Sequence, residues 1–229
     1  MGTDDYWLWM SGGTLLLVAA QVPLAQRQAV LDSLLYAQLV ADKAQGSRFA
    51  HYSPWYGRYR RGLSERGWIM TQLFRERRCT DAASVLAPVQ PLSLWLQTRH
   101  EAAGSLIERG LNTLMGNDDG LQNLRRYTFE GDESSTRITL EIGLVHPGPV
   151  ITLCSVGLQT DEPLAQVAIE RPLPARTIQG EVAVNGLSAQ LDNERFEPRR
   201  AELRALIERK QQEQCYLLDL GAVLGAEHE

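Results

Sequence analysis

The sequence predicts an α+β protein, with a mainly helical N-terminal half that contains a short strand pair and an antiparallel β-sheet C-terminal half closed by a long helix. Three observations indicate this fold class. Apolar residues recur at helical spacing over residues 23–44, alternate with polar residues over 136–144, and recur at helical spacing again over 196–207. The chain therefore changes from a helical to a β pattern near its middle.

The clearest local signal is a β-hairpin over residues 136–158. Its first strand alternates apolar and polar side chains, which is typical of a strand with one face in water. A turn follows at residues 146–149, where two prolines and a glycine reverse the chain. The second run, 150–158, is apolar on both faces except for Thr152 and Ser155, so we expect it to lie deeper in the sheet.

The N-terminal segment predicts two short strands, over residues 6–10 and 14–22, around a glycine turn. Pro23 then begins a helix that extends to about Ala44, because proline is favoured in the first turn of a helix. Val30, Leu34 and similar residues form its apolar stripe.

A second helix is expected over residues 55–66, after the capping pair Ser53 and Pro54. The aromatic run 68–74 that follows Gly67 is assigned to a strand.

Thr80 is expected to cap a short helix that ends before Pro88, and residues 91–115 predict a third long helix. Glycine and aspartate at residues 116–120 end that helix, so we place a subdomain boundary there. The two predicted subdomains are residues 1–120, mainly helical, and residues 121–229, antiparallel β with a C-terminal helix.

Beyond this boundary the sequence predicts strands, then the long helix, then a closing segment. The strands are expected over 125–130, 165–170 and 179–184, the helix from Asn193 or Glu194 to about Gln214, and a strand or docked tail over 215–220.

Composition excludes several classes of protein. The chain has 229 residues, of which 44% are hydrophobic and 22% charged, so it is neither disordered nor fibrous. Its net charge of -5 argues against attraction of the whole protein to nucleic acid or anionic lipid. Basic residues are almost all arginine, which fits a GC-rich, bacterial coding sequence.

Targeting signals are not recognised. The apolar run 14–20 is too short to span a bilayer, and Asp4 and Asp5 stand where a signal peptide carries basic residues. Cys79, Cys154 and Cys215 are widely spaced, so neither a disulfide framework nor a zinc site is predicted. We expect a cytoplasmic protein with reduced thiols and without stable membrane insertion.

The most distinctive chemistry lies in residues 48–78, where arginines alternate with aromatic residues. Arginine, tryptophan and tyrosine dominate protein-binding hot spots, and arginine also pairs with phosphate or carboxylate. The acidic span 118–174 offers an internal partner, so a structural face satisfied within the chain is the competing interpretation. The candidate binding residues are Tyr52, Trp55, Tyr56, Arg58, Tyr59, Arg60 and Arg61.

Catalytic and metal-binding motifs are weak. No serine occupies a nucleophile elbow, and a dyad of Cys79 or Cys215 with His51 or His100 remains open because such pairs form only in three dimensions. Histidine and cysteine never occur at metal-ligand spacing, and no phosphate-binding glycine loop is present, so no cofactor is predicted.

The sequence thus favours a non-enzymatic bacterial protein-interaction module, such as an adaptor, a chaperone or an immunity-like partner. Its expected partner is another protein, not nucleic acid, and its oligomeric state stays open. The alternatives are an enzyme whose hydrolase-like Cys/Ser–His site assembles in three dimensions, and a toxin or membrane-active protein.

Overall fold

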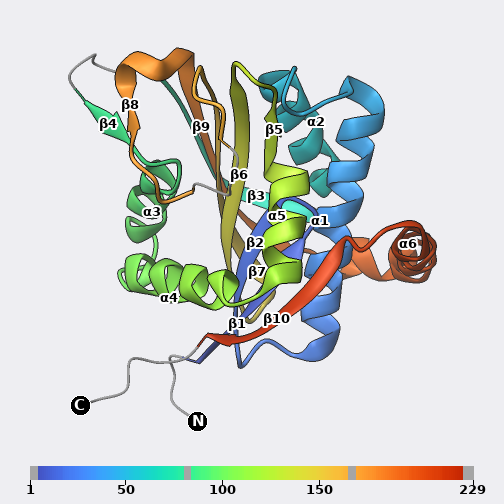
Figure 1. The fold of residues 1–229 in the computed structure, drawn as a ribbon. Coiled ribbons are helices and arrows are strands. Elements are labelled where there is room, and N and C mark those ends of the chain that lie inside the picture. Colours follow the sequence, from blue (N-terminus) through green and yellow to red (C-terminus); the bar gives the residue numbers. More distant parts are fainter. Residues whose placement is uncertain (1–4, 80–83, 165–168, 224–229) are drawn as a thin grey trace, which may run out of the picture.

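The fold is organised around one mixed β-sheet (Figure 1). The computed structural model describes residues 5–79, 84–164 and 169–223. In spatial order the strands are β10 (Leu217–Val223), β1 (Tyr6–Ser11), β2 (Thr14–Ala19), β6 (Thr136–His146), β7 (Val150–Thr160), β9 (Ile178–Leu191) and β3 (Trp68–Cys79), with β5 (Phe129–Gly131) beside β6. A separate two-stranded ribbon pairs β4 (Val85–Leu86) with β8 (Leu173–Pro174), and a 3₁₀ turn, Ala175–Thr177, follows β8.

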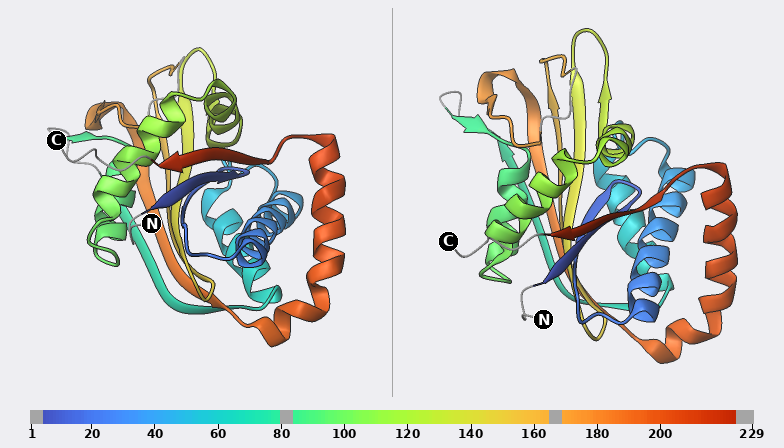
Figure 2. Two further views of the ribbon diagram at one scale, coloured as in Figure 1. Left: turned by 90° about the horizontal axis from the view of Figure 1, so that it is seen from below. Right: turned by 60° about the horizontal axis from the view of Figure 1, so that its bottom comes forward.

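Helices cover both faces of this sheet. On one face lie α1 (Leu24–Gln45) and α2 (Tyr52–Glu65), with α6 (Asn193–Glu213) packed outside α1 (Figure 2). The opposite face carries α3 (Val89–Gln97) and α4 (Ala103–Met115), and α5 (Asp118–Thr128) follows α4 toward β5. Within the described residues, no helix combines the length and apolarity needed to cross a bilayer.

The mixed α+β class predicted from the sequence is confirmed, but its layout differs. β2 runs parallel to β6, so the sheet is not purely antiparallel. The sheet also combines strands from both sides of residue 120, since β2 joins β6 and β3 joins β9. The long helix α6 packs against α1, and its predicted closing of an antiparallel half is not observed. The division into 1–120 and 121–229 remains a prediction.

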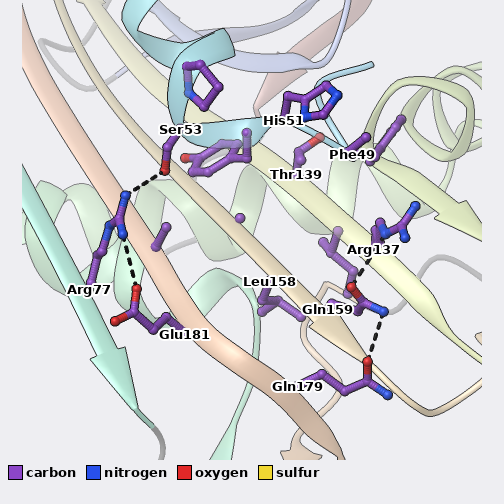
Figure 3. A pocket seen from close by; sticks show the side chains of 16 residues that line it. Phe49, His51, Ser53, Arg77, Arg137, Thr139, Leu158, Gln159, Gln179 and Glu181 are labelled. Atoms are coloured by element: carbon purple, nitrogen blue, oxygen red, sulfur yellow. Dashed lines mark hydrogen bonds and ion pairs between the residues drawn. The ribbon is translucent and has the colours of Figure 1, made fainter. Parts of the chain in front are cut away.

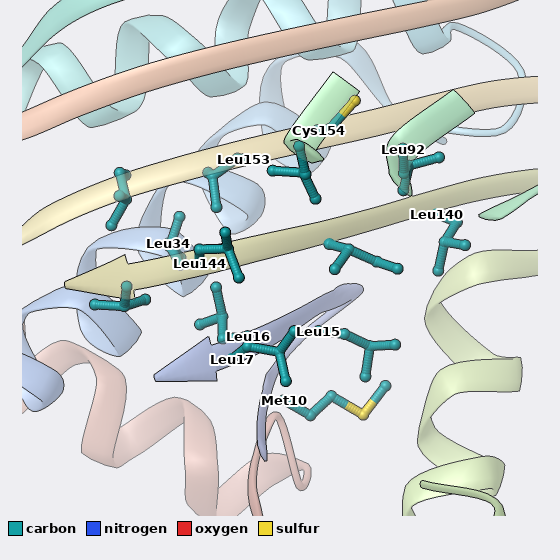
Figure 4. Close-up of a cluster of buried hydrophobic side chains, with 14 of the residues drawn as sticks. Met10, Leu15, Leu16, Leu17, Leu34, Leu92, Leu140, Leu144, Leu153 and Cys154 are labelled. Carbon is teal, nitrogen blue, oxygen red and sulfur yellow. The ribbon is translucent and has the colours of Figure 1, made fainter. Parts of the chain in front are cut away.

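The core lies on both faces of the central hairpin (Figure 4). Leu140 and Leu144 of β6 are fully buried, as are Leu153 and Cys154 of β7. Each fully buried leucine stabilises the fold by about 1.5–3 kcal/mol relative to an exposed one. The hairpin itself is confirmed, but the expected wet face of its first strand is wrong, because helices cover both sides.

Helix boundaries show two further corrections. The predicted helix 91–115 is two helices, because the backbone N–H groups of Arg99 and His100 turn back to the carbonyl oxygen of Leu96 and end α3. The predicted strand 125–130 is mostly α5, with only its end in β5. Asn117 caps α5 by accepting a hydrogen bond from the Gly120 N–H at 2.7 Å.

Other elements agree more closely with the sequence. β1, β2, α1 and α6 occur where they are predicted, and the closing segment forms strand β10 against β1. α2 begins three residues before the predicted start, and β3 and β9 extend well beyond their predicted ends. The predicted helix after Thr80 and the predicted strand 165–170 fall largely outside the described residues, although Val85 and Leu86 form strand β4.

Close packing of α3 on the sheet gives a stability prediction. A Cβ atom at Gly186 would lie 2.7 Å from the Trp95 ring, whereas one at Gly57, on the exposed side of α2, would meet nothing within 4 Å. We expect Gly186→Ala to lower the free energy of unfolding by about 1–3 kcal/mol. The matched change Gly57→Ala should raise it by up to about 1 kcal/mol. Urea denaturation measures both, and equal effects would contradict this packing.

Candidate functional site

A row of polar side chains crosses the sheet face beneath α2. The register aligns one residue from each of five neighbouring strands, and because aligned residues point to the same face, their side chains form a continuous row. The five residues are Thr14, Glu141, Ser155, Asn185 and Arg75. The α2 side of the sheet is therefore polar where the α3 side is mainly apolar.

Glu141 is the central acid of this row and is buried. Its Oε2 accepts hydrogen bonds from the Thr14 hydroxyl at 2.6 Å and from the Tyr59 hydroxyl at 2.9 Å, while its Oε1 has no partner within the described structure. Burial raises the pKa of Glu141 to about 7, against the opposing effects of these two hydrogen bonds and of Arg48.

Arg48 connects to the polar row through Gln38 of α1, whose side-chain amide donates to the Thr14 hydroxyl at 3.1 Å. Its guanidinium donates to Gln38 Oε1 at 3.1 Å and to Asp42 Oδ2 at 3.2 Å, and it stacks 4.4 Å from the Trp55 ring. Trp55 in turn donates its Nε1–H to Asp42 at 2.7 Å. These contacts hold α1 and α2 together as one layer.

Tyr52 attaches the first turn of α2 to the sheet. Its hydroxyl donates to Ser155 Oγ at 2.8 Å and accepts from Asn185 Nδ2 at 3.2 Å. The ring packs directly on Gly157, where a Cβ atom would lie 2.5 Å from a ring carbon. Burial raises the pKa of the Tyr52 hydroxyl above its ordinary value, so this group remains protonated and continues to donate.

A pocket of about 370 Å³ opens where α2 begins (Figure 3). Residues 49–54 form one wall, and strands β3, β6, β7 and β9 form the other. The backbone N–H groups of Tyr52 and Ser53 lie in the first turn and have no partner within the helix. His51 makes no capping hydrogen bond with its side chain. We call this cavity the α2 pocket.

Two arginines from the strands border the α2 pocket. Arg77 donates to Ser53 Oγ at 3.2 Å and forms an ion pair with Glu181 at 3.3 Å. Arg137 donates to Gln159 at 3.4 Å and pairs with Glu130 at 3.1 Å. Both guanidinium side chains are about half exposed, at 47% and 43%, so both remain accessible to a ligand.

Thr139 contributes a buried hydroxyl to the wall of the α2 pocket. The residue is only 7% exposed, it lines the cavity, and its hydroxyl has no hydrogen-bond partner within the described structure. A buried polar group without a partner costs about 1–3 kcal/mol, and native proteins contain few of them. The oxygen itself has almost no accessible surface, so a polar ligand in the cavity would reach this hydroxyl only after a small movement of the pocket wall.

The sequence-predicted binding residues are placed in two ways. The rings of Trp55, Tyr56 and Tyr59 are buried, with Trp55 against α1 and the hydroxyl of Tyr59 bonded to Glu141 of the sheet. Arg58 pairs with Glu65 at 3.2 Å, Arg60 is half-buried, Arg61 is exposed, and Tyr52 lines the α2 pocket. A contact surface formed by these seven residues remains a prediction. The arginines of α2 are more available for it than the aromatic rings, which are mostly buried.

Sequence reasoning missed the strand residues of the α2 pocket. Thr139, Arg137, Gln159 and Gln179 come from segments distant from α2 and carry no motif. Only Arg77 lay within the arginine-rich stretch. The alternation over 136–144 was a usable signal, because it placed Arg137 and Thr139 on one face, but their covering by α2 was not visible in the sequence.

Histidines and cysteines do not form a nucleophilic pair in the described residues. His51 is exposed beside the α2 pocket, whereas the rings of His100 and His146 stack 5.2 Å apart. Cys154 is buried, and burial raises its pKa, so its thiol stays protonated. Cys215 is exposed, and no hydrogen bond joins it to a histidine there. The side chain of Cys79 lies outside the described part of the chain. Among the described side chains, no three of the His, Cys, Asp or Glu type are grouped as a metal ion would require.

Comparisons with known proteins give weak similarities only. No protein-family model and no curated protein matches the chain. Among solved structures, a delta-endotoxin is similar with a TM-score of 0.45 at 10% identity, over 79% of this chain and 81% of that one. The activated Cyt2Ba monomer from Bacillus thuringiensis subsp. israelensis gives 0.44 at 12%, over 80% and 99%. The Evf virulence factor gives 0.35 at 10%, over 89% and 82%. At these TM-scores the similarity establishes neither a shared fold nor a shared function.

The buried Glu141 predicts a pH dependence of stability. Its pKa of about 7 in the folded protein exceeds the ordinary 4.5, so the stabilisation by the neutral acid is complete below pH 4.5 and is lost as pH rises to 7. We expect the free energy of unfolding to fall by roughly 3 kcal/mol over that interval. Urea denaturation at a series of pH values should show a much smaller fall for Glu141→Gln.

An exposed glutamate provides the control. Glu208 is paired with Arg204 on α6, and its side chain is 57% exposed. Glu208→Gln should retain the wild-type dependence of stability on pH. If Glu141→Gln and Glu208→Gln gave the same pH profile, the buried acid would not be its source.

Proposed function

We propose that the protein is a non-enzymatic binding module that holds an anionic group of its partner in the α2 pocket. The observation that carries this proposal is the Thr139 hydroxyl, which is buried in the wall of the cavity without a partner in the described structure and would become accessible on a small movement of that wall. A phosphate or carboxylate oxygen is the complement of such a donor. Binding would supply the missing hydrogen bond, whose absence costs about 1–3 kcal/mol in the free protein.

The surroundings of Thr139 favour an anion over a neutral ligand. The first turn of α2 lies in the wall of the cavity, so the positive end of the helix dipole is close to a bound anion. Arg77 and Arg137 add two cations, and arginine binds phosphate and carboxylate through paired N–H donors. Within the pocket lining, Glu181 is the acidic residue, and it is already paired with Arg77.

The same geometry supports binding rather than nucleophilic catalysis. Ser53 is the serine in the first turn of α2, and its Oγ accepts a hydrogen bond from Arg77. Arginine stays protonated and cannot act as a general base. No hydrogen bond connects Ser53 to His51 within the described structure, so Ser53 lacks the activation that a serine nucleophile needs.

The biological setting follows from the sequence-based hypothesis. An adaptor, chaperone or immunity-like partner would recognise an acidic group on another protein, and such a role fits a cytoplasmic location. The alternative is a toxin or membrane-active protein, and the similar solved structures include proteins named as toxins. Their TM-scores are too low to support that activity for this chain.

Phenyl phosphate is a simple probe of the α2 pocket, with phenol as its uncharged counterpart. In a ligand-observed NMR titration we expect phenyl phosphate to bind with a Kd on the order of 1 mM and phenol not to bind. Arg77→Gln and Arg137→Gln should each weaken binding by about tenfold, because each removes a charge-assisted hydrogen bond.

Thr139→Val is the most informative variant, because it keeps the shape of the side chain and removes only the hydroxyl. It should weaken phenyl phosphate binding by about fivefold while leaving stability equal or higher, since an unpaired buried group disappears. Arg171→Gln removes an exposed arginine paired with Glu162 outside the pocket and should leave binding unchanged. Wild-type affinity in Thr139→Val and Arg77→Gln would refute the proposed function.

A further inference from the structure

Strand β3 lies at one end of the main sheet, with only β9 beside it among the described strands (Figure 2). Its other edge therefore presents backbone N–H and C=O groups that no neighbouring strand pairs. Such an edge accepts an additional strand from another chain. We propose that the outer edge of β3 is a docking site for an extended, acidic segment of a partner protein, beyond the anion site of the α2 pocket.

The backbone of β3 is regular where this docking would occur. From Gln72 to Cys79 every residue pairs in register with β9, from Ser188 to Glu181. The single irregularity lies between Met70 and Gln72, which sets the start of the usable edge. An added strand therefore has a regular template, without bulges, over the arginine-bearing end of β3.

Charge identifies the kind of segment that fits. The template holds Arg75, Arg77 and Arg78 but a single acid, Glu76, which pairs with Arg78. Arg75 is exposed and forms no ion pair in the described structure. An acidic strand lying beside β3 would place carboxylates opposite these guanidinium groups, and opposite charges on adjacent strands stabilise the pairing.

The exposed side chain of Leu73 sets a second requirement for the partner segment. Leu73 is 56% exposed although it lies on the same face as the buried Leu187 with which it pairs. Leu73, Arg75 and Arg77 alternate along the strand and so share one face. A partner segment that alternates apolar and acidic residues would cover Leu73 and neutralise the arginines on that same face.

A second copy of the chain is a poorer occupant of this edge. Antiparallel pairing of two β3 strands would bring one set of three arginines beside another, with one glutamate in each strand to offset them. Like charges across adjacent strands destabilise a sheet. The net charge of the whole chain is -5, so the basic edge is a local feature that favours an acidic partner.

The probe is a fluorescein-labelled peptide of alternating valine and glutamate, measured by fluorescence anisotropy with the full-length protein. Two matched peptides complete the set: one has lysine in place of glutamate, and one is N-methylated at every backbone nitrogen. We expect the acidic peptide to bind and the other two to bind at least about tenfold more weakly. Equal binding of the N-methylated peptide would overturn strand addition, because that peptide cannot donate backbone hydrogen bonds.

Protein variants test the same site independently of the α2 pocket. Arg75→Glu should weaken binding of the acidic peptide by about tenfold or more, whereas Arg171→Glu, far from β3 in sequence and paired with Glu162, should not. Thr139→Val should leave peptide binding unchanged, so failure of this inference and failure of the proposed function are separable. Wild-type binding by Arg75→Glu, or a concentration-dependent dimer in size-exclusion chromatography that Arg75→Glu dissolves, would overturn the proposal.

Discussion

The docking of α2 on a polar sheet face depends on the contact between Tyr59 and the buried carboxyl group of Glu141. Tyr59 is fully buried, and its hydroxyl donates to Glu141 at 2.9 Å. Without α2 in this position Glu141 would be solvated, and no cavity would exist at the N-terminus of the helix. The acid is tolerated because it is neutral over much of the pH range, since burial disfavours its charged form.

The two faces of the sheet stabilise the fold by different means. On the α3 side Trp95 packs on Gly186 and the contacts are mainly apolar, so they tolerate little change in volume. On the α2 side, hydrogen bonds from Tyr52 and Tyr59 reach across the interface. A hydrogen-bonded interface specifies one position for the helix, since a shift along the sheet would leave several buried groups without partners. This precision keeps the first turn of α2 aligned with the strand residues of the pocket.

Local signals in the sequence predicted much of the secondary structure. The hairpin at residues 136–158 and helices α1 and α6 depend on periodicity and turn residues within a short window. Such local patterns can be recognised in the sequence alone. Helix α5 was missed because Asn117 and the acidic residues after it suit both a solvated turn and a helix N-terminus. The prediction that one face of β6 is exposed to solvent was wrong for another reason. Alternation of residue types indicates which face is polar, but only the tertiary structure decides whether a helix covers that face.

The candidate site was less predictable than the fold, because its residues meet across long separations in the chain. Thr14 and Glu141 are 127 residues apart, and Tyr52 and Asn185 are 133 apart. The arginine-rich stretch was recognised, yet its aromatic residues became the buried side of α2 while Arg75 and Arg77 went to an edge strand. Arg77 borders the α2 pocket, and its neighbour two positions earlier ends the polar row at the open edge. One strand thus connects the pocket to the edge, so a partner seated along β3 would lie beside the cavity that we propose as the site for its anionic group.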